Sequence, residues 1–181
     1  MECREFVTAT DGAFAREERM KDKYLITRFL AIVLYRKKKL TDESGKEYIY
    51  RGNMDELLGK TMEYINHMDA EGVFKLEGLT KECLVKAWFY GGKDIFRRMS
   101  RERKTPVNMN IFETVMYCMM FISECMEGRK EKIFGGLRNL LDSSWFLDNI
   151  GNHRDGSLKL NERLDKAESL GRNFGKNDSE T

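Results

Sequence analysis

The chain has 181 residues, of which 41% are hydrophobic and 34% charged, with 11 Met, 11 Phe and a single Pro. This length suits one folded domain with a substantial core, and the composition excludes collagen-like, Pro-rich and broadly disordered proteins. The formal net charge is only +2, so no overall excess of charge points to a nucleic acid or a membrane as the partner.

The first predicted helix covers Asp22 to Lys38, where apolar residues recur at helical spacing around most of the circumference. This breadth indicates a central, buried helix that ends in the cations Lys37 to Lys39. The segment Tyr48–Tyr50 permits a short strand, but one isolated strand cannot form a sheet.

Two further helices are predicted before residue 93. Asn53 and Glu56 have the spacing of a capping box, so a helix is expected to begin after Asn53 and to stop near Gly72. Thr80 is expected to open the next helix, which ends at Gly91 and Gly92.

The C-terminal half is expected to contain a short helical segment over 94–99, a basic loop and a second buried helix over 111–126 that begins at Asn108 or Asn110. Three shorter amphipathic helices follow, over 129–141, 145–150 and 160–170. The sequence therefore predicts an all-α, irregular bundle of six to eight helices with at most one short hairpin. We expect one domain over 1–170 and a polar, disordered tail over 171–181.

The longest apolar runs fall well short of the roughly 20 residues that a membrane-spanning helix needs. The N-terminal residues include acids, and no apolar run follows them as it would in a secretory signal peptide. Four cysteines without a Cys-x-x-Cys pair are interpreted as buried, reduced thiols. We therefore expect a cytoplasmic protein without a bound metal or other cofactor.

Catalytic motifs are weak. Gly59-Lys60-Thr61 imitates the end of a phosphate-binding loop, but Met54 stands where the first glycine belongs, and the tripeptide falls within a predicted helix. Of the two histidines, His67 is interpreted as a surface residue near a helix end. His153 lies beside Arg154 in a polar loop, and an enzyme acting on phosphates through this pair remains a further hypothesis.

Two basic clusters are the candidate binding sites, in segments where the local charge is positive. Their members are Arg97, Arg98, Arg101, Arg103 and Lys104 in one and Lys37 and Lys38 in the other. Such cations bind phosphates, and the binding weakens steeply with salt. The alternative interpretation is a solvated loop whose arginines pair with the acidic 41–82 segment, and for Lys37 and Lys38 it is compensation of the helix dipole.

Several short motifs follow one another in an order that resembles a known family. They are Arg19-Met20-Lys21-Asp22, Arg28-Phe29-Leu30-Ala31, Asp94-Ile95-Phe96-Arg97-Arg98, Pro106-Val107-Asn108, Phe112-Glu113, and Phe146 to Ile150 with Arg163. Their order and spacing over about residues 15–170 resemble the C-terminal helical part of the GmrSD-like family, bacterial proteins of the type IV restriction and anti-phage class.

Members of that family begin with a ParB/sulfiredoxin-like domain whose Asp-Gly-Gln-Gln-Arg motif is implied to bind and hydrolyse nucleotide, and many end in a His-Asn-His nuclease. Here Asp11-Gly12 and Asp155-Gly156 are followed by Ala13 and Ser157, so neither pair matches that motif. The resemblance implies a non-catalytic helical module, which would be a fragment, a truncated member or one half of a split system.

Such a module is expected to contact DNA, or a ParB-like NTPase or nuclease subunit, through its basic segment. The alternative is a purely structural docking domain for a separately encoded NTPase domain. That alternative predicts no affinity for nucleic acid and an exposed apolar patch where the partner binds.

Overall fold

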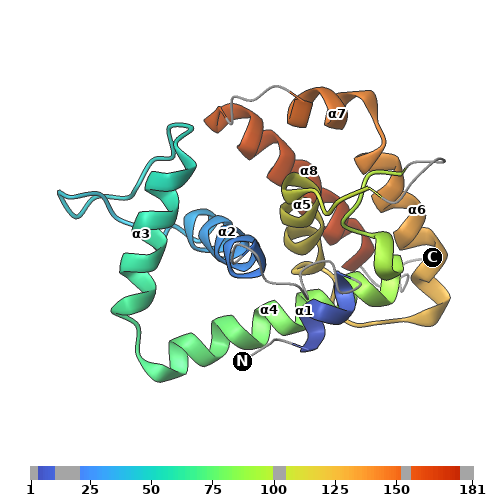
Figure 1. Cartoon of the computed structure of the whole chain (residues 1–181), viewed down its shortest axis with the longest axis horizontal. Coiled ribbons are helices and arrows are strands. Elements are labelled where there is room, and N and C mark those ends of the chain that lie inside the picture. Colours follow the sequence, from blue (N-terminus) through green and yellow to red (C-terminus); the bar gives the residue numbers. More distant parts are fainter. Residues whose placement is uncertain (1–3, 11–20, 100–104, 152–155, 176–181) are drawn as a thin grey trace.

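The computed structural model describes residues 4–10, 21–99, 105–151 and 156–175. Within these residues there are eight α-helices and no strand, which confirms the expected all-α bundle (Figure 1). The helices are α1 Arg4–Ala9, α2 Lys21–Arg36, α3 Met54–Asn66, α4 Ala70–Gly91, α5 Met109–Met119, α6 Lys130–Leu141, α7 Ser144–Gly151 and α8 Ser157–Gly175. Single 3-10 turns, η1 Gly92–Asp94 and η2 Glu127–Arg129, adjoin α4 and α6.

Helices α2 and α5 form the centre of the bundle, as their sequences predicted. Every residue from Ile111 to Met119 is buried, and α2 buries residues on several sides, including Ala31, Val33 and Leu34. A helix that is apolar nearly all round is stable only when other elements surround it. Helix α5 packs against α2, α4 and α8, and Figure 1 shows α5 and α8 adjacent beside α2.

Helix α3 begins where its cap predicts but ends early. The side-chain oxygen of Asn53 accepts a hydrogen bond from the backbone amide of Glu56 at 3.3 Å. The predicted stop at Gly72 is wrong, because Asp69 starts a new helix by accepting the Gly72 amide at 2.7 Å. A local capping bond thus divides a segment that its apolar pattern had joined.

Helix α4 is continuous over 22 residues, so the predicted helix start at Thr80 is also wrong. The Thr80 hydroxyl donates to the Leu76 carbonyl at 2.8 Å, a bond typical of threonine inside a helix rather than at its cap. The predicted end is confirmed at Gly92, whose φ of 63° favours glycine.

Helix α5 is shorter than the predicted 111–126. Asn108 caps it, accepting from the amides of Asn110 at 3.0 Å and Ile111 at 3.1 Å. The segment that follows is held in a non-helical path by α4, because Lys86 donates to the Ile122 carbonyl and Tyr90 donates to the Glu124 carbonyl at 2.6 Å. These contacts join distant segments, and helical spacing alone gave no indication of them.

The last helix extends beyond the predicted boundary at 170. Gly171 and Phe174 are buried in α8, which runs to Gly175. A side chain at Gly171 would lie 2.5 Å from the Cys118 carbonyl oxygen, so this glycine allows α8 to approach α5 closely. The helix α1 was not predicted; it buries Phe6 and Ala9 and packs on α4.

The short strand considered at Tyr48–Tyr50 is absent, and a single antiparallel bridge joins Thr41 to Glu47 instead. The thiol interpretation holds for Cys83 and Cys118, which are free and buried, whereas Cys125 is free and exposed. Within the described parts of the chain, no helix has both the length and the apolar character needed to cross a membrane.

Candidate functional site

In the basic run at 97–104, the first cation, Arg97, is buried. Arg97 is only 6% exposed. Its guanidinium donates to the carbonyls of Thr105 and, at 3.3 Å, of Thr10, and its Nε lies 3.6 Å from an Asp94 carboxylate oxygen. Arg97 therefore connects its own segment to the segment at Thr105 and to the residue that follows α1, Thr10.

Of the other cluster members, the structure describes Arg98 alone. Arg98 is exposed, while Arg101, Arg103 and Lys104 lie outside the described residues. The short helix predicted over 94–99 is wrong: η1 ends at Asp94, and the chain after it pairs at Arg97 with Val107 in an isolated bridge.

The second basic cluster lies just past the C-terminal end of α2. Lys37 and Lys38 are both exposed, and Lys38 has a positive φ of 54° where the chain leaves the helix. The Lys38 ammonium lies 3.3 Å from the Glu47 carboxylate. Lys37 makes no side-chain hydrogen bond or ion pair with the other described residues, so its charge is not compensated by a direct contact.

These two lysines line a pocket of about 570 Å³ between the end of α2, the following loop, α5 and α8. The lining contains four cations, two carboxylates, four aromatic rings and one amide, together with three aliphatic or thioether side chains. Its members are Val33, Tyr35, Arg36, Lys37, Lys38, Glu47, Tyr48, Ile49, Tyr117, Met120, Phe121, Asn161, Glu168 and Arg172.

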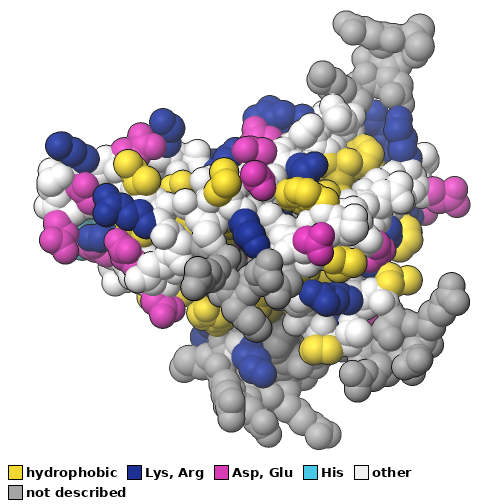
Figure 2. Space-filling model, turned by 90° about the horizontal axis from the view of Figure 1, so that it is seen from above, with side chains coloured by type: hydrophobic (Ala, Val, Ile, Leu, Met, Phe, Trp, Pro, Cys, Tyr) yellow, Lys and Arg dark blue, Asp and Glu magenta, His cyan; other side chains and the backbone are white. Residues whose placement is uncertain are grey.

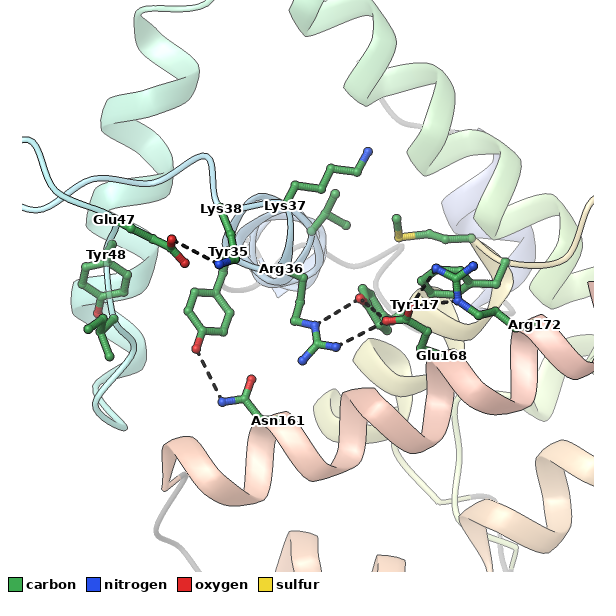
Figure 3. A pocket seen from close by; sticks show the side chains of 14 residues that line it. Tyr35, Arg36, Lys37, Lys38, Glu47, Tyr48, Tyr117, Asn161, Glu168 and Arg172 are labelled. Atoms are coloured by element: carbon green, nitrogen blue, oxygen red, sulfur yellow. Dashed lines mark hydrogen bonds and ion pairs between the residues drawn. The ribbon is translucent and has the colours of Figure 1, made fainter.

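A polar network joins α2, α5 and α8 at this basic pocket, and Figure 3 shows Arg36, Tyr117, Glu168 and Arg172 in it. Arg36 from α2 donates to Asp165 at 2.7 Å and to Glu168 at 3.3 Å, and Arg172 pairs with Glu168 at 2.8 Å. The Tyr117 hydroxyl donates to Glu168 at 3.2 Å. One carboxylate of α8 thus receives groups from α2, α5 and its own helix.

The network determines which groups are charged. Burial raises the pKa of Glu168, but hydrogen bonds from Arg172, Arg36 and Tyr117 outweigh this effect, so the pKa is below its usual value. Burial raises the pKa of Tyr117 although Arg36 opposes the shift. At neutral pH the pocket therefore contains an ionised Glu168 and a neutral phenol, and Lys37 and Lys38 are further cations of its lining.

These groups are suited to binding anions, because ammonium, guanidinium, phenol and amide groups all donate hydrogen bonds. Figure 2 shows basic and acidic side chains interspersed over one face of the molecule, so positive charge is a local feature. Among the described residues, no group of three His, Cys, Asp or Glu side chains is placed to hold a metal ion.

The other motif residues occupy structural positions. Gly59-Lys60-Thr61 lies inside α3, and the Thr61 hydroxyl donates to the Leu57 carbonyl at 2.8 Å. Because the backbone amides of these three residues belong to the helix, they are not arranged around a phosphate. His67 is exposed at the end of α3, as its position in the sequence suggested, with Nδ1 2.7 Å from the Glu63 carbonyl oxygen. His153 and Arg154 lie outside the described residues.

A buried ionic cluster was not predicted as a site. The Glu113 carboxylate of α5 is fully buried and pairs with Arg28 of α2 and, at 2.7 Å, with Arg163 of α8. Arg28 also donates to the Tyr24 hydroxyl at 3.1 Å. All three charged residues belong to the motifs of the family resemblance, and an acid within the apolar run of α5 was the available signal.

No protein-family model, curated protein or solved structure matches this chain. The geometry of the two basic clusters is therefore the basis for assigning a function.

A second, apolar pocket of about 480 Å³ lies where α1, α2, α3 and α4 meet. Its walls include Ile26, Leu30, Ile65, Val73 and Leu76. Val73 is 42% exposed, and its neighbour Phe74 is 73% exposed. Apolar surface of this kind is often used for contact with another protein.

Proposed function

We propose that this protein is a non-catalytic helical module of the restriction and anti-phage type that contacts DNA phosphates through the basic pocket. One observation carries the proposal: Lys37 and Lys38 share a single pocket with Arg36 and Arg172, which come from α2 and α8. This arrangement concentrates cations from distant parts of a nearly neutral chain.

The pairing pattern supports phosphate binding at the opening of the pocket. Arg36 and Arg172 are largely committed to Glu168 and Asp165, whereas Lys37 has no charged partner among the described residues. The Lys38–Glu47 pair is well exposed, with 71% and 52% of the two side chains accessible. Such exposed pairs contribute about 0–1 kcal/mol and exchange readily for a phosphate.

The test is binding to fluorescently labelled DNA at two salt concentrations, read by anisotropy. We expect measurable binding at low salt that falls steeply as salt rises, because each phosphate contact releases counterions. The double variant Lys37→Glu/Lys38→Glu should abolish this binding. A matched control is Lys75→Glu, which changes a 72% exposed lysine on α4 that does not line the pocket.

Arg98→Glu tests the other cluster in the same assay, at the one exposed cation of it that the structure describes. Loss of binding in Arg98→Glu would extend the surface to the 97–104 run. Binding that survives the double lysine substitution would refute the proposal.

The apolar pocket supports a second candidate function, docking to a separately encoded ParB/sulfiredoxin-like NTPase domain. In that case Val73→Asp should weaken binding of the purified NTPase domain, and Lys37→Glu/Lys38→Glu should leave it unchanged. An apolar surface loses binding energy when a charge must be buried in it.

A further inference from the structure

The basic pocket combines positive charge with apolar and aromatic side chains, of which Ile49 is exposed and Tyr35 and Phe121 are half-buried. Figure 3 shows its lining on two sides of the α2 end: Tyr35, Lys38 and Tyr48 lie toward the loop after α2, and Tyr117 and Arg172 lie toward α5 and α8. Each side therefore offers at least one cation and at least one ring.

Val33, Tyr48 and Tyr117 are buried, so the accessible apolar surface comes from the other members of the lining. Ile49 is 68% exposed at the loop side of the pocket, although a large aliphatic side chain normally gains by burial. On the other side, Arg172 lies over the ring of Phe121, 4.7 Å from the ring centre. Guanidinium and aromatic planes of this kind are surfaces on which a nucleobase stacks.

Polar groups suited to a base edge lie between these surfaces. Asn161 of α8 donates to the hydroxyl of the half-buried Tyr35 at 3.4 Å, a long bond that a ligand can replace. The Asn161 amide can both donate and accept hydrogen bonds, which matches the mixed edge of an unpaired base.

We infer that the pocket takes an unpaired nucleotide and thereby selects single-stranded over duplex nucleic acid; this inference rests on the DNA contact proposed above. The volume of about 570 Å³ falls within the roughly 300–1,000 Å³ of pockets that enclose small ligands. A single strand can place a base against Tyr35 or Ile49 and its phosphates against Lys37 and Lys38.

A duplex cannot use the pocket in this way. Its bases are paired and stacked inside the helix, so only phosphates can reach Lys37 and Lys38, and the apolar walls gain no contact. The strand preference must therefore depend on the apolar lining, whereas the salt dependence depends on the lysines.

The experiment measures the affinities of the full chain for four probes at one salt concentration: oligothymidylate, oligouridylate, a DNA duplex and inorganic polyphosphate. Polyphosphate supplies negative charge without bases, and the oligouridylate arm shows whether the strand is DNA or RNA. We expect oligothymidylate or oligouridylate to bind at least about fivefold more tightly than the duplex and polyphosphate.

Two variants then test the lining. Ile49→Ser changes an exposed side chain, and Tyr35→Leu keeps an apolar side chain in place of a ring that packs edge-on against Tyr50 at 6.0 Å. Each should weaken single-strand binding about fivefold or more and leave duplex and polyphosphate binding unchanged. Phe74→Ser is the control, because Phe74 is 73% exposed and does not line this pocket.

The outcomes separate the inference from the proposed function. Lysine-dependent binding with equal affinity for single strands and duplex, or with no effect of either lining variant, overturns the inference alone. Binding that does not require Lys37 and Lys38, or no binding to any probe at low salt, overturns both. Circular dichroism of each variant confirms that a lost affinity does not reflect a lost fold.

Discussion

Substitution Glu113→Gln removes the negative charge from the buried ionic cluster. The Glu113 side chain is 0% exposed, and its partners Arg28 and Arg163 are 5% and 1% exposed as residues. Glutamine has nearly the same shape, so the substitution changes charge with little change in volume. Two guanidinium groups then remain buried between α2, α5 and α8 without their shared counter-ion.

The expected cost follows from this geometry. Removing one partner of a buried ion pair destabilises a protein by about 3–5 kcal/mol, because the remaining charge is desolvated and uncompensated. Glu113 serves two arginines, and the Nε of Arg163 already has no hydrogen-bond partner within the described chain. For a protein of this size each kcal/mol lowers Tm by about 2–4 °C, so we expect a fall of about 6–20 °C.

Urea unfolding followed by far-ultraviolet circular dichroism measures the loss in unfolding free energy. The control is Glu71→Gln, which breaks the 2.6 Å pair with Lys75, in which both side chains are more than 70% exposed. This exposed pair should cost about 0.5 kcal/mol or less. A loss below about 1 kcal/mol in Glu113→Gln would refute the view that the cluster depends on this carboxylate.

Three further predictions concern packing and pH. Gly171→Ala should destabilise the protein by about 1–3 kcal/mol, because its methyl group would meet the Cys118 carbonyl at 2.5 Å; a thermal midpoint equal to that of the wild type would contradict this. Gly59→Ala, with no atom within 4 Å of the new methyl, should stabilise α3 by about 0.5–1 kcal/mol in the same measurement. Burial raises the pKa of the Cys83 and Cys118 thiols to about 12 from an ordinary 9.0, so their contribution to stability is complete below pH 9 and is lost as the pH rises toward 12. Above pH 9 the free energy of unfolding should fall by about 1 kcal/mol per thiol and pH unit. The variant Cys83→Ala/Cys118→Ala should show a smaller fall, and an unchanged fall would contradict the raised pKa of the two thiols.

Part of the fold could be predicted because some signals are local. The Asn53 cap and the positive φ at Gly92 concern only neighbouring residues, and the apolar character of α2 and α5 required their burial. One error arose where two local signals competed. Gly72 resembled a helix end, but Asp69 provided a stronger start for the next helix.

The candidate site was only partly accessible to sequence reasoning. Lys37 and Lys38 were identified because consecutive cations are visible in a sequence, whereas Arg172 has no cation beside it in the chain and lies on a helix of mixed charge. Arg97 belonged to the most basic run but is buried among backbone carbonyls. Net charge along a segment does not show which guanidinium groups the fold uses internally.

The sequence by itself determined the helical class, the two central helices and several of their ends, since these depend on spacing and capping between residues close in the chain. Only the tertiary structure decided that Glu113 joins Arg28 to Arg163, and that Lys37 shares a pocket with Arg172. Such contacts depend on how α2, α5 and α8 are oriented against one another. That orientation is set by the packing of the whole core, including the close approach at Gly171.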